Sequence, residues 1–352
     1  MMCEYDMAVV GCGPAGATFA RLISKKYKVV VIDKKSAGTK FEKPCGGLLS
    51  EDAQKALSQF EITLPKEVLV SPQIFAVRTI DVGAKIIKHY QRTYLNMDRH
   101  KFDLWMMSMI PDSVDKVSGE CRNISRSGEG FKIEIKDSDQ NERAISAKYI
   151  IGADGANSIV RKKFFRSKKP REYVAIQQWF KGEDINPFYS CIFDRETSDC
   201  CSWSISKNGY FIFGGAFPKK DCREAFERQK KRLENFGFFF KDPLKTEACI
   251  VLRPRGLFDF ACAEDGAFLI GEAAGFISPS SLEGISWAIN SGAILADVFN
   301  KNKAKFEQKY KRKTIKLRLR LLGKVIKCPF MYKPGLRKIV MKSGLKTIEI
   351  RK

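Results

Sequence analysis

Two apolar runs near the start of the chain are separated by a glycine-rich turn and a stretch with helical periodicity. Residues 5–10 (YDMAVV) end in four apolar side chains and predict a buried strand, and residues 29–32 (VVVI) predict another. Between them, apolar residues recur at three- and four-residue spacing from Ala17 to Ile23, which is typical of a helix. A strand, a turn, a helix and a strand in this order predict a βαβ unit with parallel strands.

Two later apolar strands are predicted to end beside an acidic residue. Residues 149–152 (YIIG) lead to Asp154, and residues 267–270 (AFLI) lead to Glu272 at the start of a helix. A carboxylate at this end of a parallel strand can accept hydrogen bonds from the hydroxyl groups of a sugar or ribityl chain. These strands therefore extend the first unit into a Rossmann-like domain that binds its ligand at the strand ends.

The middle of the chain alternates apolar and polar residues with a period of two, which predicts a second set of strands. The candidate strands are residues 73–80, 84–90, 173–181, 190–193, 201–205 and 210–216. We expect them to form a mostly antiparallel sheet that covers the ligand face of the first domain, with a cavity at the junction.

The predicted fold class is α/β, in which the antiparallel sheet is a substrate domain and the end of the chain is a basic helical segment. The Rossmann-like domain is expected to be assembled from separated pieces. The expected boundaries are 1–70, 98–165 and 255–300 for this domain, 71–97 and 166–254 for the substrate domain, and 301–352 for the C-terminal segment.

The composition is that of a globular chain. Hydrophobic residues make up 44% and charged residues 29% of the 352 residues, which excludes wholesale disorder. The apolar runs fall short of the roughly 18 residues that span a bilayer. Glu4 and Asp6 stand where a secretory signal would have its basic and apolar parts, so we expect a cytoplasmic protein.

Cysteine and histidine usage argues against a metal site. The chain has 11 cysteines with no CxxC pair, and only two histidines, His89 and His100. Reduced thiols in a cytoplasm are the simplest interpretation. We therefore expect no bound metal.

The net charge of +23 is concentrated at the end of the chain. Residues 301–352 contain 19 Lys or Arg and two acids, Glu307 and Glu349, so this segment carries 19 − 2 = +17. The first 300 residues therefore carry only 23 − 17 = +6. No zinc knuckle or other nucleic-acid module accompanies the charge, so we do not expect a nucleic-acid partner.

The basic segment allows two interpretations. Residues 316–326 combine apolar side chains with closely spaced cations, as a basic amphipathic helix does on the anionic inner face of a membrane. Alternatively, the helix packs Leu319, Leu322 and Ile326 against the body and leaves a solvated basic face. An acidic electron donor would also suit the positive charge.

The glycine-rich turn at residues 11–16 (GCGPAG) has the GxGxxG spacing of a dinucleotide-binding fingerprint. Gly11 permits the tight turn, Gly13 lets the backbone approach a pyrophosphate, and Gly16 lets the helix pack closely on the strand. Asp33 follows Gly11 by 22 positions, where it can accept bonds from ribose hydroxyls. The spacing alone does not separate NAD from FAD.

In their order and spacing, the GxGxxG turn, the Asp154-Gly155 pair and the Gly271-Glu272 pair resemble the flavoprotein hydroxylase superfamily, which binds FAD. Within it, the chain resembles the geranylgeranyl reductase family. The matching segments are KPCGG at 43–47, RHKFDLW at 99–105, Ala273-Ala274-Gly275, where related hydroxylases usually carry His at the last position, and SSLEGI at 280–285.

This resemblance implies FAD as the cofactor and a set of residues around it. The implied cofactor-binding residues are Gly11, Gly13, Pro14, Ala15, Gly16, Asp33, Lys34, Cys45, Gly46, Gly47, Arg99, Asp154, Glu272, Gly284 and Ile285. Glu272 stands where the family usually has Asp. The run at 213–218 (FGGAFP) lacks the aromatic residue that the family carries at position 215, so we expect a pocket of different shape.

Cys45 is the candidate catalytic residue. A thiol between Pro44 and two glycines could donate a proton or position the substrate, and the alternative is a small buried residue in a tight turn.

The function implied by the resemblance is FAD-dependent reduction of C=C bonds in a hydrophobic, isoprenoid-like substrate by hydride transfer from the reduced flavin N5. The alternatives are an FAD-dependent aromatic monooxygenase and a flavin electron-transfer or binding protein. The electron donor is left open between NAD(P)H and a reduced ferredoxin or flavoprotein. The substrate and the oligomeric state are also left open.

Overall fold

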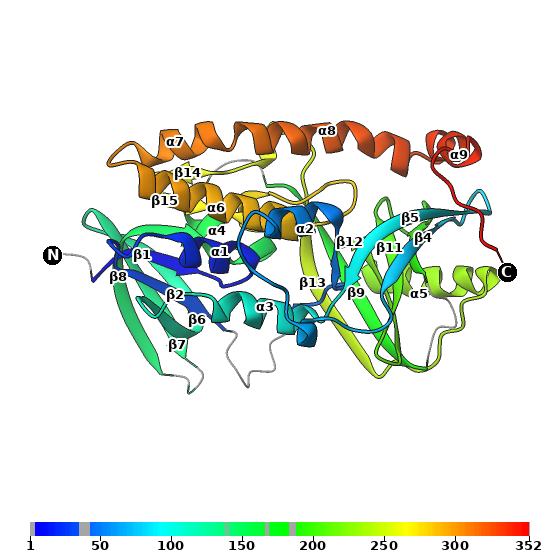
Figure 1. Ribbon diagram of the computed structural model, residues 1–352, viewed down its shortest axis with the longest axis horizontal. Helices are drawn as coiled ribbons and strands as arrows, with labels where there is room; N and C mark the ends of the chain where they lie inside the picture. The colour runs from blue at the N-terminus through cyan, green and yellow to red at the C-terminus, as the bar shows by residue number, and fades with distance from the viewer. Residues whose placement is uncertain are drawn as a thin grey trace.

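The computed structural model describes residues 4–34, 43–137, 139, 141–165, 169–182 and 188–351. Two β-sheets lie next to each other, and a row of C-terminal helices runs along one side of both (Figure 1). The α/β fold class predicted from the sequence is confirmed.

The first sheet has the strand order β1-β2-β6-β7-β8-β15-β14, with an additional pairing between β1 and β8. β1 runs parallel to β2 and to β8, and β15 runs parallel to β8, so these strands point their carboxyl ends toward the same edge. The strands are β1 (Tyr5–Val10), β2 (Val29–Asp33), β6 (Val114–Ser127), β7 (Gly130–Asp137), β8 (Glu142–Gly152), β14 (Ala263–Glu264) and β15 (Ala267–Leu269).

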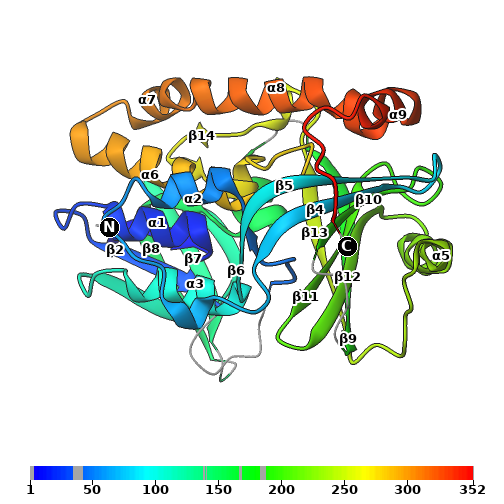
Figure 2. The ribbon, with the colours of Figure 1, turned by 45° about the vertical axis from the view of Figure 1, so that its right-hand side comes forward.

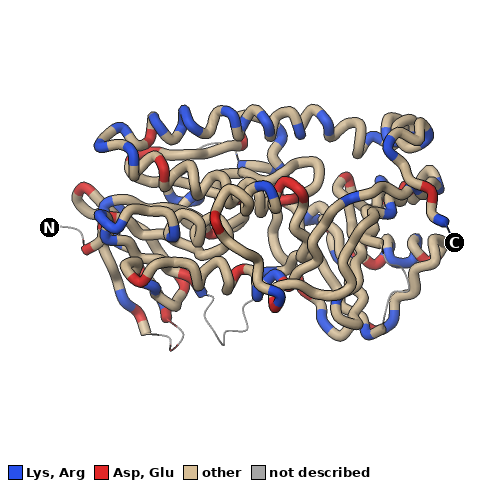
Figure 3. Tube along the Cα trace, in the orientation of Figure 1, with Lys and Arg blue, Asp and Glu red and all other residues tan. Residues whose placement is uncertain are grey.

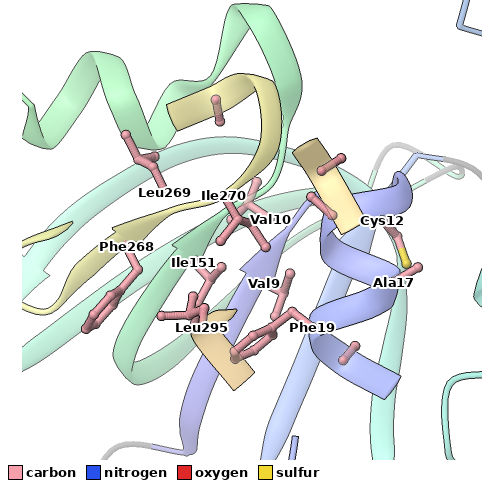
Figure 4. Packing of buried hydrophobic residues seen from close by; sticks show 14 of the residues in the cluster. Val9, Val10, Cys12, Ala17, Phe19, Ile151, Phe268, Leu269, Ile270 and Leu295 are labelled. Atoms are coloured by element: carbon pink, nitrogen blue, oxygen red, sulfur yellow. The ribbon is translucent and has the colours of Figure 1, made fainter. Parts of the chain in front are cut away.

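The core of this unit lies between the sheet and the paired helices α1 (Pro14–Leu22) and α6 (Ile285–Lys301). Figure 4 shows Phe19 of α1 and Leu295 of α6 against strand residues such as Val9, all of them fully buried. The two helices approach closely because Gly292 has no side chain; a Cβ there would lie 2.5 Å from the backbone oxygen of Ala15.

Shorter helices complete the first unit. They are α2 (Glu51–Leu57), α3 (Arg99–Ser108), α4 (Ile159–Phe164) and the 3₁₀ turns η1 (Lys66–Val68), η2 (Gly155–Asn157), η4 (Leu257–Asp259) and η5 (Gly271–Ala274). Their N-termini are capped by side chains in three cases: Ser50 accepts from the N–H of Ala53, Asp98 from Lys101, and Ser158 from Arg161.

The second sheet has the order β13-β9-β12-β11-β10-β4-β5-β3 and is mostly antiparallel, as predicted. Its strands are β3 (Leu48–Leu49), β4 (Ile74–Asp81), β5 (Ile86–Asn96), β9 (Arg171–Lys181), β10 (Tyr189–Phe193), β11 (Cys201–Lys207), β12 (Tyr210–Pro218) and β13 (Lys245–Arg253). One face packs on α5 (Cys222–Leu233), which η3 (Glu234–Phe236) follows.

Side chains alternate between the two faces of this sheet. Phe180, Phe213 and Phe217 point toward the face that packs on α5, where Phe213 and Phe217 lie 5.3 and 5.7 Å from the Phe226 ring. The other face carries Trp179 and turns toward the first unit.

The strands of the two sheets follow the segments expected for the two domains, except β3. The β3 residues pair with Leu95 and Asn96 of β5 in the second sheet, although they lie within segment 1–70. The domain boundaries themselves stay a prediction.

The C-terminal segment forms α7 (Phe306–Lys313), α8 (Ile315–Tyr332) and α9 (Pro334–Lys342). Figures 1 and 2 show α7 and α8 lying along the molecule, with α9 beside the second sheet. Tyr310 donates from its hydroxyl to the Leu269 oxygen at 2.9 Å, and Tyr332 donates to the Ser280 oxygen at 2.7 Å. The segment is therefore packed on the body.

The packing of α8 differs in one detail from the helix that we expected to pack Leu319, Leu322 and Ile326 against the body. Leu317 and Leu321 are buried against the body, whereas Leu319 is 56% and Ile326 72% exposed. Leu322 is half-buried. The apolar residues of this helix fall on both sides of it, so the sequence pattern did not identify the side that meets the body.

In the part of the chain that the structure describes, no helix is long and apolar enough to cross a membrane. Within the same residues there is no cluster of His, Cys, Asp and Glu side chains that could hold a metal ion.

Candidate functional site

The glycine turn connects β1 to α1 at the carboxyl edge of the first sheet. Gly11 adopts a φ of +95°, and a Cβ there would lie 2.6 Å from the Ala153 oxygen. A Cβ at Gly16 would lie 2.1 Å from the Gly11 oxygen. Gly13, which precedes Pro14 at the first position of α1, has open space where its Cβ would be. The turn is thus closed on the protein side and open on the side of Gly13.

Asp33 at the end of β2 holds the turn by accepting a hydrogen bond from the Cys12 N–H. The next residue, Lys34, points elsewhere: its ammonium pairs with Glu120 of β6 at 3.0 Å. Asp33 therefore lies at the glycine turn as predicted, while the contact observed for Lys34 is with the neighbouring strand.

Asp154 follows β8 and lies directly beside the glycine turn, since a Cβ at Gly11 would be 2.8 Å from the Asp154 Cα. Its Oδ2 accepts from the Ile159 N–H at 2.7 Å, but its Oδ1 is buried without a hydrogen-bond partner in the described structure. Burial raises the pKa of this carboxyl to about 6, although hydrogen bonds from Ser158 and Ile159 oppose the shift. A buried acceptor that lacks a donor indicates a ligand hydroxyl at this position.

Glu272 occupies the corresponding position after β15, in η5. Its Oε2 lies 2.8 Å from the Lys43 ammonium, and its Oε1 accepts from the Leu252 N–H of β13 at 3.0 Å. The Glu272 carboxylate raises the pKa of Lys43 and outweighs the effect of burial. The glutamate side chain thus connects the first sheet to the second and to the loop that carries Cys45.

The loop of Cys45, Gly46 and Gly47 is fixed by its glycines. Gly47 adopts a φ of +62°, and a Cβ there would lie 2.4 Å from the Met97 oxygen. The Gly47 N–H lies 3.4 Å from the Cys45 Sγ, and its carbonyl oxygen accepts from the Lys207 ammonium at 3.0 Å. No larger residue fits at Gly47 without displacing the loop.

Lys207 was not singled out from the sequence, because a lysine at a strand end carries no distinctive pattern. In the structure its ammonium is buried and also donates to the Asn96 Oδ1 at 2.7 Å and to the Met97 oxygen. Burial lowers the pKa of Lys207 to about 8. Lys207 joins β11, the end of β5 and the Cys45 loop at one point.

Arg99 begins α3 and brings a second cation to Cys45. Its Nε donates to the Asp103 Oδ1 at 2.8 Å within the helix. Burial alone would lower the pKa of Arg99, but Asp103 and the Cys45 side chain together raise it further than burial lowers it. The guanidinium is therefore charged and adjacent to the thiol.

The start of α6 lies beside the Glu272 turn, where a Cβ at Gly271 would be 3.5 Å from the Ala288 Cβ. Gly284 is the N-cap and Ile285 the first residue, which is buried. Glu283 accepts from the Ser286 N–H at 2.7 Å. Leu282 adopts a left-handed φ of 55°, which is strained for a residue with a side chain.

A cavity of about 210 Å³ opens at the junction of the two units. Cys45, Arg99 and His100 line it from the first unit, and Gln177, Trp179 and Lys207 line it from the second sheet. The His100 Nδ1 is buried without a partner in the described structure. Of the predicted site residues, Cys45 and Arg99 are the ones whose side chains reach this cavity.

We expected the missing aromatic side chain at position 215 to change the shape of the pocket, but this position does not face the cavity. Gly215 belongs to the sheet face that packs on α5, because its Cβ would meet Ser202 and the Phe217 ring. Gly214 lies on the cavity side, where the Trp203 indole fills the space: a Cβ at Gly214 would be 2.8 Å from that ring. The same indole lies 3.5 Å from the Cβ position of Gly46, so a neighbouring strand supplies an aromatic ring next to the Cys45 loop.

Several of the predicted residues lie along one path. Gly11 contacts Asp154, and the Cβ position of the next residue, Gly155, lies 3.7 Å from the Lys43 ammonium. Lys43 pairs with Glu272. Cys45, two residues after Lys43 in the sequence, lines the cavity. Residues from segments far apart in the sequence therefore meet along a path from the glycine turn to the junction of the sheets.

The donor set along this path fits FAD. Open space at Gly13 and the positive end of α1 suit a pyrophosphate, and the unpaired Asp154 oxygen suits a hydroxyl group. Lys43 and Arg99 place two cations between the turn and the cavity.

Comparison with known proteins agrees with this assignment. The family model "FAD binding domain" matches residues 116–184. A structure of a geranylgeranyl bacteriochlorophyll reductase-like protein from Thermoplasma acidophilum superposes with a TM-score of 0.78 at 20% identity, covering 96% of this chain and 90% of that one. A probable FAD-dependent monooxygenase from Pseudomonas aeruginosa superposes with a TM-score of 0.67 at 15% identity, covering 97% and 100%.

At the sequence level, Protein CbrA of Escherichia coli O9:H4 (strain HS) is 50% identical over 345 residues, covering 97% of this chain and 94% of that protein. The FAD-binding match, together with the donor set of the site, identifies FAD as the cofactor, and the two superposed structures show the shared fold. The chain therefore belongs to the Protein CbrA family, and it contains an FAD-binding domain.

Proposed function

We propose that this flavoprotein reduces a C=C bond in a hydrophobic, isoprenoid-like substrate. The observation that carries the proposal is the position of Cys45. Its thiol lines the cavity at the junction of the two units, and Lys207 fixes the adjacent Gly47 carbonyl. A thiol held at this point can deliver a proton to a substrate bound between the flavin and the second sheet.

The cavity also has an apolar part that suits a hydrocarbon chain. Val70, Met97, Trp179 and Tyr210 contribute to its lining. Trp179 is held by a hydrogen bond from its Nε1 to the Glu247 carboxylate at 2.7 Å. A rigid aromatic wall opposite the Cys45 loop can align a flat alkene without polar contacts to it.

Reduced FAD, when bound, supplies a hydride from its N5 to one carbon of the double bond. In our proposal the Cys45 thiol gives its proton to the other carbon, and the resulting thiolate is neutralised by a proton from solvent. The adjacent Arg99 guanidinium stabilises the thiolate in the interval. The ion pair between Lys43 and Glu272 fixes the chain two residues before Cys45.

Gly275 gives a further reason to prefer a reductase over a hydroxylase. It adopts a φ of +82°, and a Cβ there would lie 2.7 Å from the Asp259 oxygen. The position where related hydroxylases usually carry His therefore has no room for a side chain. The proteins of similar structure include both a reductase-like protein and a probable monooxygenase, so the monooxygenase is the alternative to be tested.

The decisive experiment begins with the FAD-loaded protein reduced without oxygen by dithionite. Prenyl compounds with an allylic double bond are added to one sample, and aromatic compounds with air to another. Reoxidation of the flavin by the prenyl compound, with a product heavier by two hydrogens, is the expected result. Oxygen-dependent hydroxylation of the aromatic compound would replace the proposal with a monooxygenase, and a flavin that reacts with neither would indicate an electron-transfer protein.

The same assay serves to identify the electron donor. NAD(P)H and a reduced ferredoxin or small flavoprotein are supplied in place of dithionite, and the rate of flavin reduction is measured with each.

A Cys45→Ala variant tests the role of the thiol. We expect it to retain FAD while product formation from the reduced enzyme falls about 10²-fold or more, the usual range for a lost proton donor. Cys222→Ala, on α5 away from the cavity, is the matched control and should keep full activity. If Cys45→Ala instead loses FAD, or keeps full turnover, the thiol is not the proton donor.

A further inference from the structure

Helix α8 has apolar side chains on two opposite faces. The inner face consists of Leu317, Leu321 and Tyr332, which are buried against the body. The outer stripe consists of Ile315, Leu319, Ile326 and Phe330, which are 44%, 56%, 72% and 51% exposed. With 100° of rotation per residue, the four residues of the outer stripe fall within a narrow sector on the side opposite the inner face.

The outer stripe is not needed to attach the helix to the body. The inner face supplies that attachment, together with the Tyr332 hydroxyl and a salt bridge between Lys324 and Asp52 of α2 at 3.0 Å. Four large apolar side chains therefore stay in solvent although the helix is already anchored. Single exposed apolar residues are common on protein surfaces, but an aligned row of them marks a contact surface.

Further exposed apolar residues follow α8 in the sequence. In α9, Ile339 is 67% and Val340 44% exposed, and Leu345 after the helix is 71% exposed. Of the 16 large hydrophobic residues exposed on the described structure, nine lie in residues 315–350. The exposed apolar surface is thus concentrated on one short part of the chain.

Cations flank the outer stripe, and α8 and α9 themselves contain no acidic residue. Lys316, Arg320 and Lys327 are exposed and lie next to the stripe around the helix, and Lys338 and Lys342 are exposed on α9. The sequence contains no Asp or Glu between Glu307 and Glu349. Figure 3 shows Lys and Arg recurring along α7 and α8.

We propose that the outer stripe of α8 binds the surface of an anionic lipid bilayer, with the helix lying in the plane of the interface. An apolar row flanked by lysine and arginine matches the boundary between acyl chains and negative headgroups. From Ile315 to Phe330 the stripe is about 22 Å long at a rise of 1.5 Å per residue. The occupant is a bilayer because α8 and α9 carry charge of one sign and α8 lies along the outside of the molecule (Figures 1 and 2).

This proposal does not rest on the proposed reaction, because binding to vesicles is measured without turnover. The FAD-loaded protein is sedimented with vesicles of phosphatidylcholine alone and with vesicles in which about a third of the lipid is phosphatidylglycerol. We expect binding to the anionic vesicles at least about tenfold stronger than to the neutral ones.

The test of the stripe itself is the double variant Leu319→Ser, Ile326→Ser, which leaves the charge unchanged. Its matched control is Phe239→Ser, Leu244→Ser, which removes two exposed apolar residues (82% and 60%) outside the C-terminal segment. We expect the first variant to lose about tenfold or more in vesicle affinity and the control to bind like the parent protein.

Three results would overturn the proposal. The first is equal binding by both variants, which would reduce the interaction to charge alone. The second is loss of binding in both variants, which would place the contact elsewhere. The third is absence of vesicle binding with concentration-dependent self-association that Leu319→Ser, Ile326→Ser abolishes, which would assign the stripe to a second copy of the chain. Both variants are checked for bound FAD and for unchanged thermal unfolding.

Discussion

Asp154 combines two properties that conflict in the absence of a ligand. Its carboxyl is buried, with a pKa raised to about 6, and one of its oxygens has no hydrogen-bond partner in the described structure. Above pH 6 the folded protein therefore carries a desolvated charge that the unfolded chain exposes to water. Binding of a hydroxyl group at Oδ1 would remove part of that cost, so the residue exchanges stability for affinity.

An Asp154→Asn variant should unfold less readily than the parent protein when FAD is absent, and it should bind FAD more weakly. Between pH 4 and 6 the folded state keeps a proton that the unfolded state has released, so this group lowers stability as the pH rises through that window. At pH 7 the FAD-free variant should be more stable than the parent protein by roughly 1–3 kcal/mol, a difference that shrinks toward pH 4. Its FAD affinity should nevertheless be about tenfold weaker.

Urea unfolding of both FAD-free proteins across pH 4–7 measures the first effect, and fluorescence titration with FAD measures the second. Stability profiles that run parallel across the pH range would show that Asp154 is not the titrating group. Unchanged FAD affinity would remove it from the cofactor site.

At the scale of elements, the attachment of α9 depends on one buried ion pair. The Arg337 Nε lies 2.7 Å from the Asp81 Oδ2 at the end of β4, and both side chains are almost completely buried. Arg337 also donates to the Met331 oxygen at 2.9 Å and stacks on the Phe193 ring at 5.0 Å. The pair is therefore part of a packed contact between the C-terminal helices and the second sheet.

Removing one partner of this pair should be costly. Arg337→Met leaves the Asp81 charge buried and uncompensated, so we expect a loss of about 3–5 kcal/mol in the free energy of unfolding. The double variant Asp81→Asn, Arg337→Met should recover part of that loss, because no unpaired charge is left. Urea denaturation measures both, with Lys338→Met on the exposed side of α9 as the control. A double variant no better than Arg337→Met would mean that packing, and not charge, dominates the contact.

The elements themselves were largely predictable, because strands and helices have different apolar periods. Residues 5–10 and 29–32 form β1 and β2, and the pair predicted at 73–80 and 84–90 forms the antiparallel β4 and β5. The pattern of apolar residues did not predict which face of an element packs against the rest of the molecule. Where both faces of an element are apolar, as in α8 and β12, the sequence does not say which face meets the body, and the expectations for Leu319 and Gly215 failed for that reason.

The parts of the site that could be predicted are those that lie in short segments with a recognisable local sequence. The glycine turn was found from its GxGxxG spacing, and the Cys45 loop from its resemblance to a family segment; Gly11 and Gly47 in these two segments adopt left-handed φ angles. Lys207 acts through contacts between segments that are distant in the sequence, and a lysine at a strand end gives no local signal. The position of β3 in the second sheet likewise depends on a pairing with β5 that no nearby residue indicates.

At the scale of the whole molecule, the C-terminal segment connects both units. Tyr310 is bonded to the first sheet at Leu269, Tyr332 to Ser280, and Arg337 to the second sheet at Asp81. Its positive charge therefore belongs to a packed part of the structure, while its exposed face is free to make contacts.

Truncation should distinguish these two parts of the segment. A chain that ends after residue 304 loses Tyr310 and Leu321, both fully buried, and should be insoluble or unfold without a cooperative transition. A chain that ends after Ser343 keeps α7, α8 and α9 and should unfold within about 5 °C of the full-length protein. Thermal unfolding and sedimentation measure both. A soluble, cooperatively folded chain ending at residue 304 would show that the C-terminal segment is not needed to stabilise the two units.

The Cys45 loop is tied at one end to Glu272, through Lys43, and at the other to the second sheet, through Lys207 and the pairing of Leu48 with Asn96. The depth at which the thiol projects into the cavity is therefore set by the spacing of two separately built layers. A fragment that contains only the nucleotide-binding layer would carry the cysteine without a defined position. Small shifts of one layer against the other would therefore change how far the thiol projects into the cavity, even when the cause of the shift lies far from the loop.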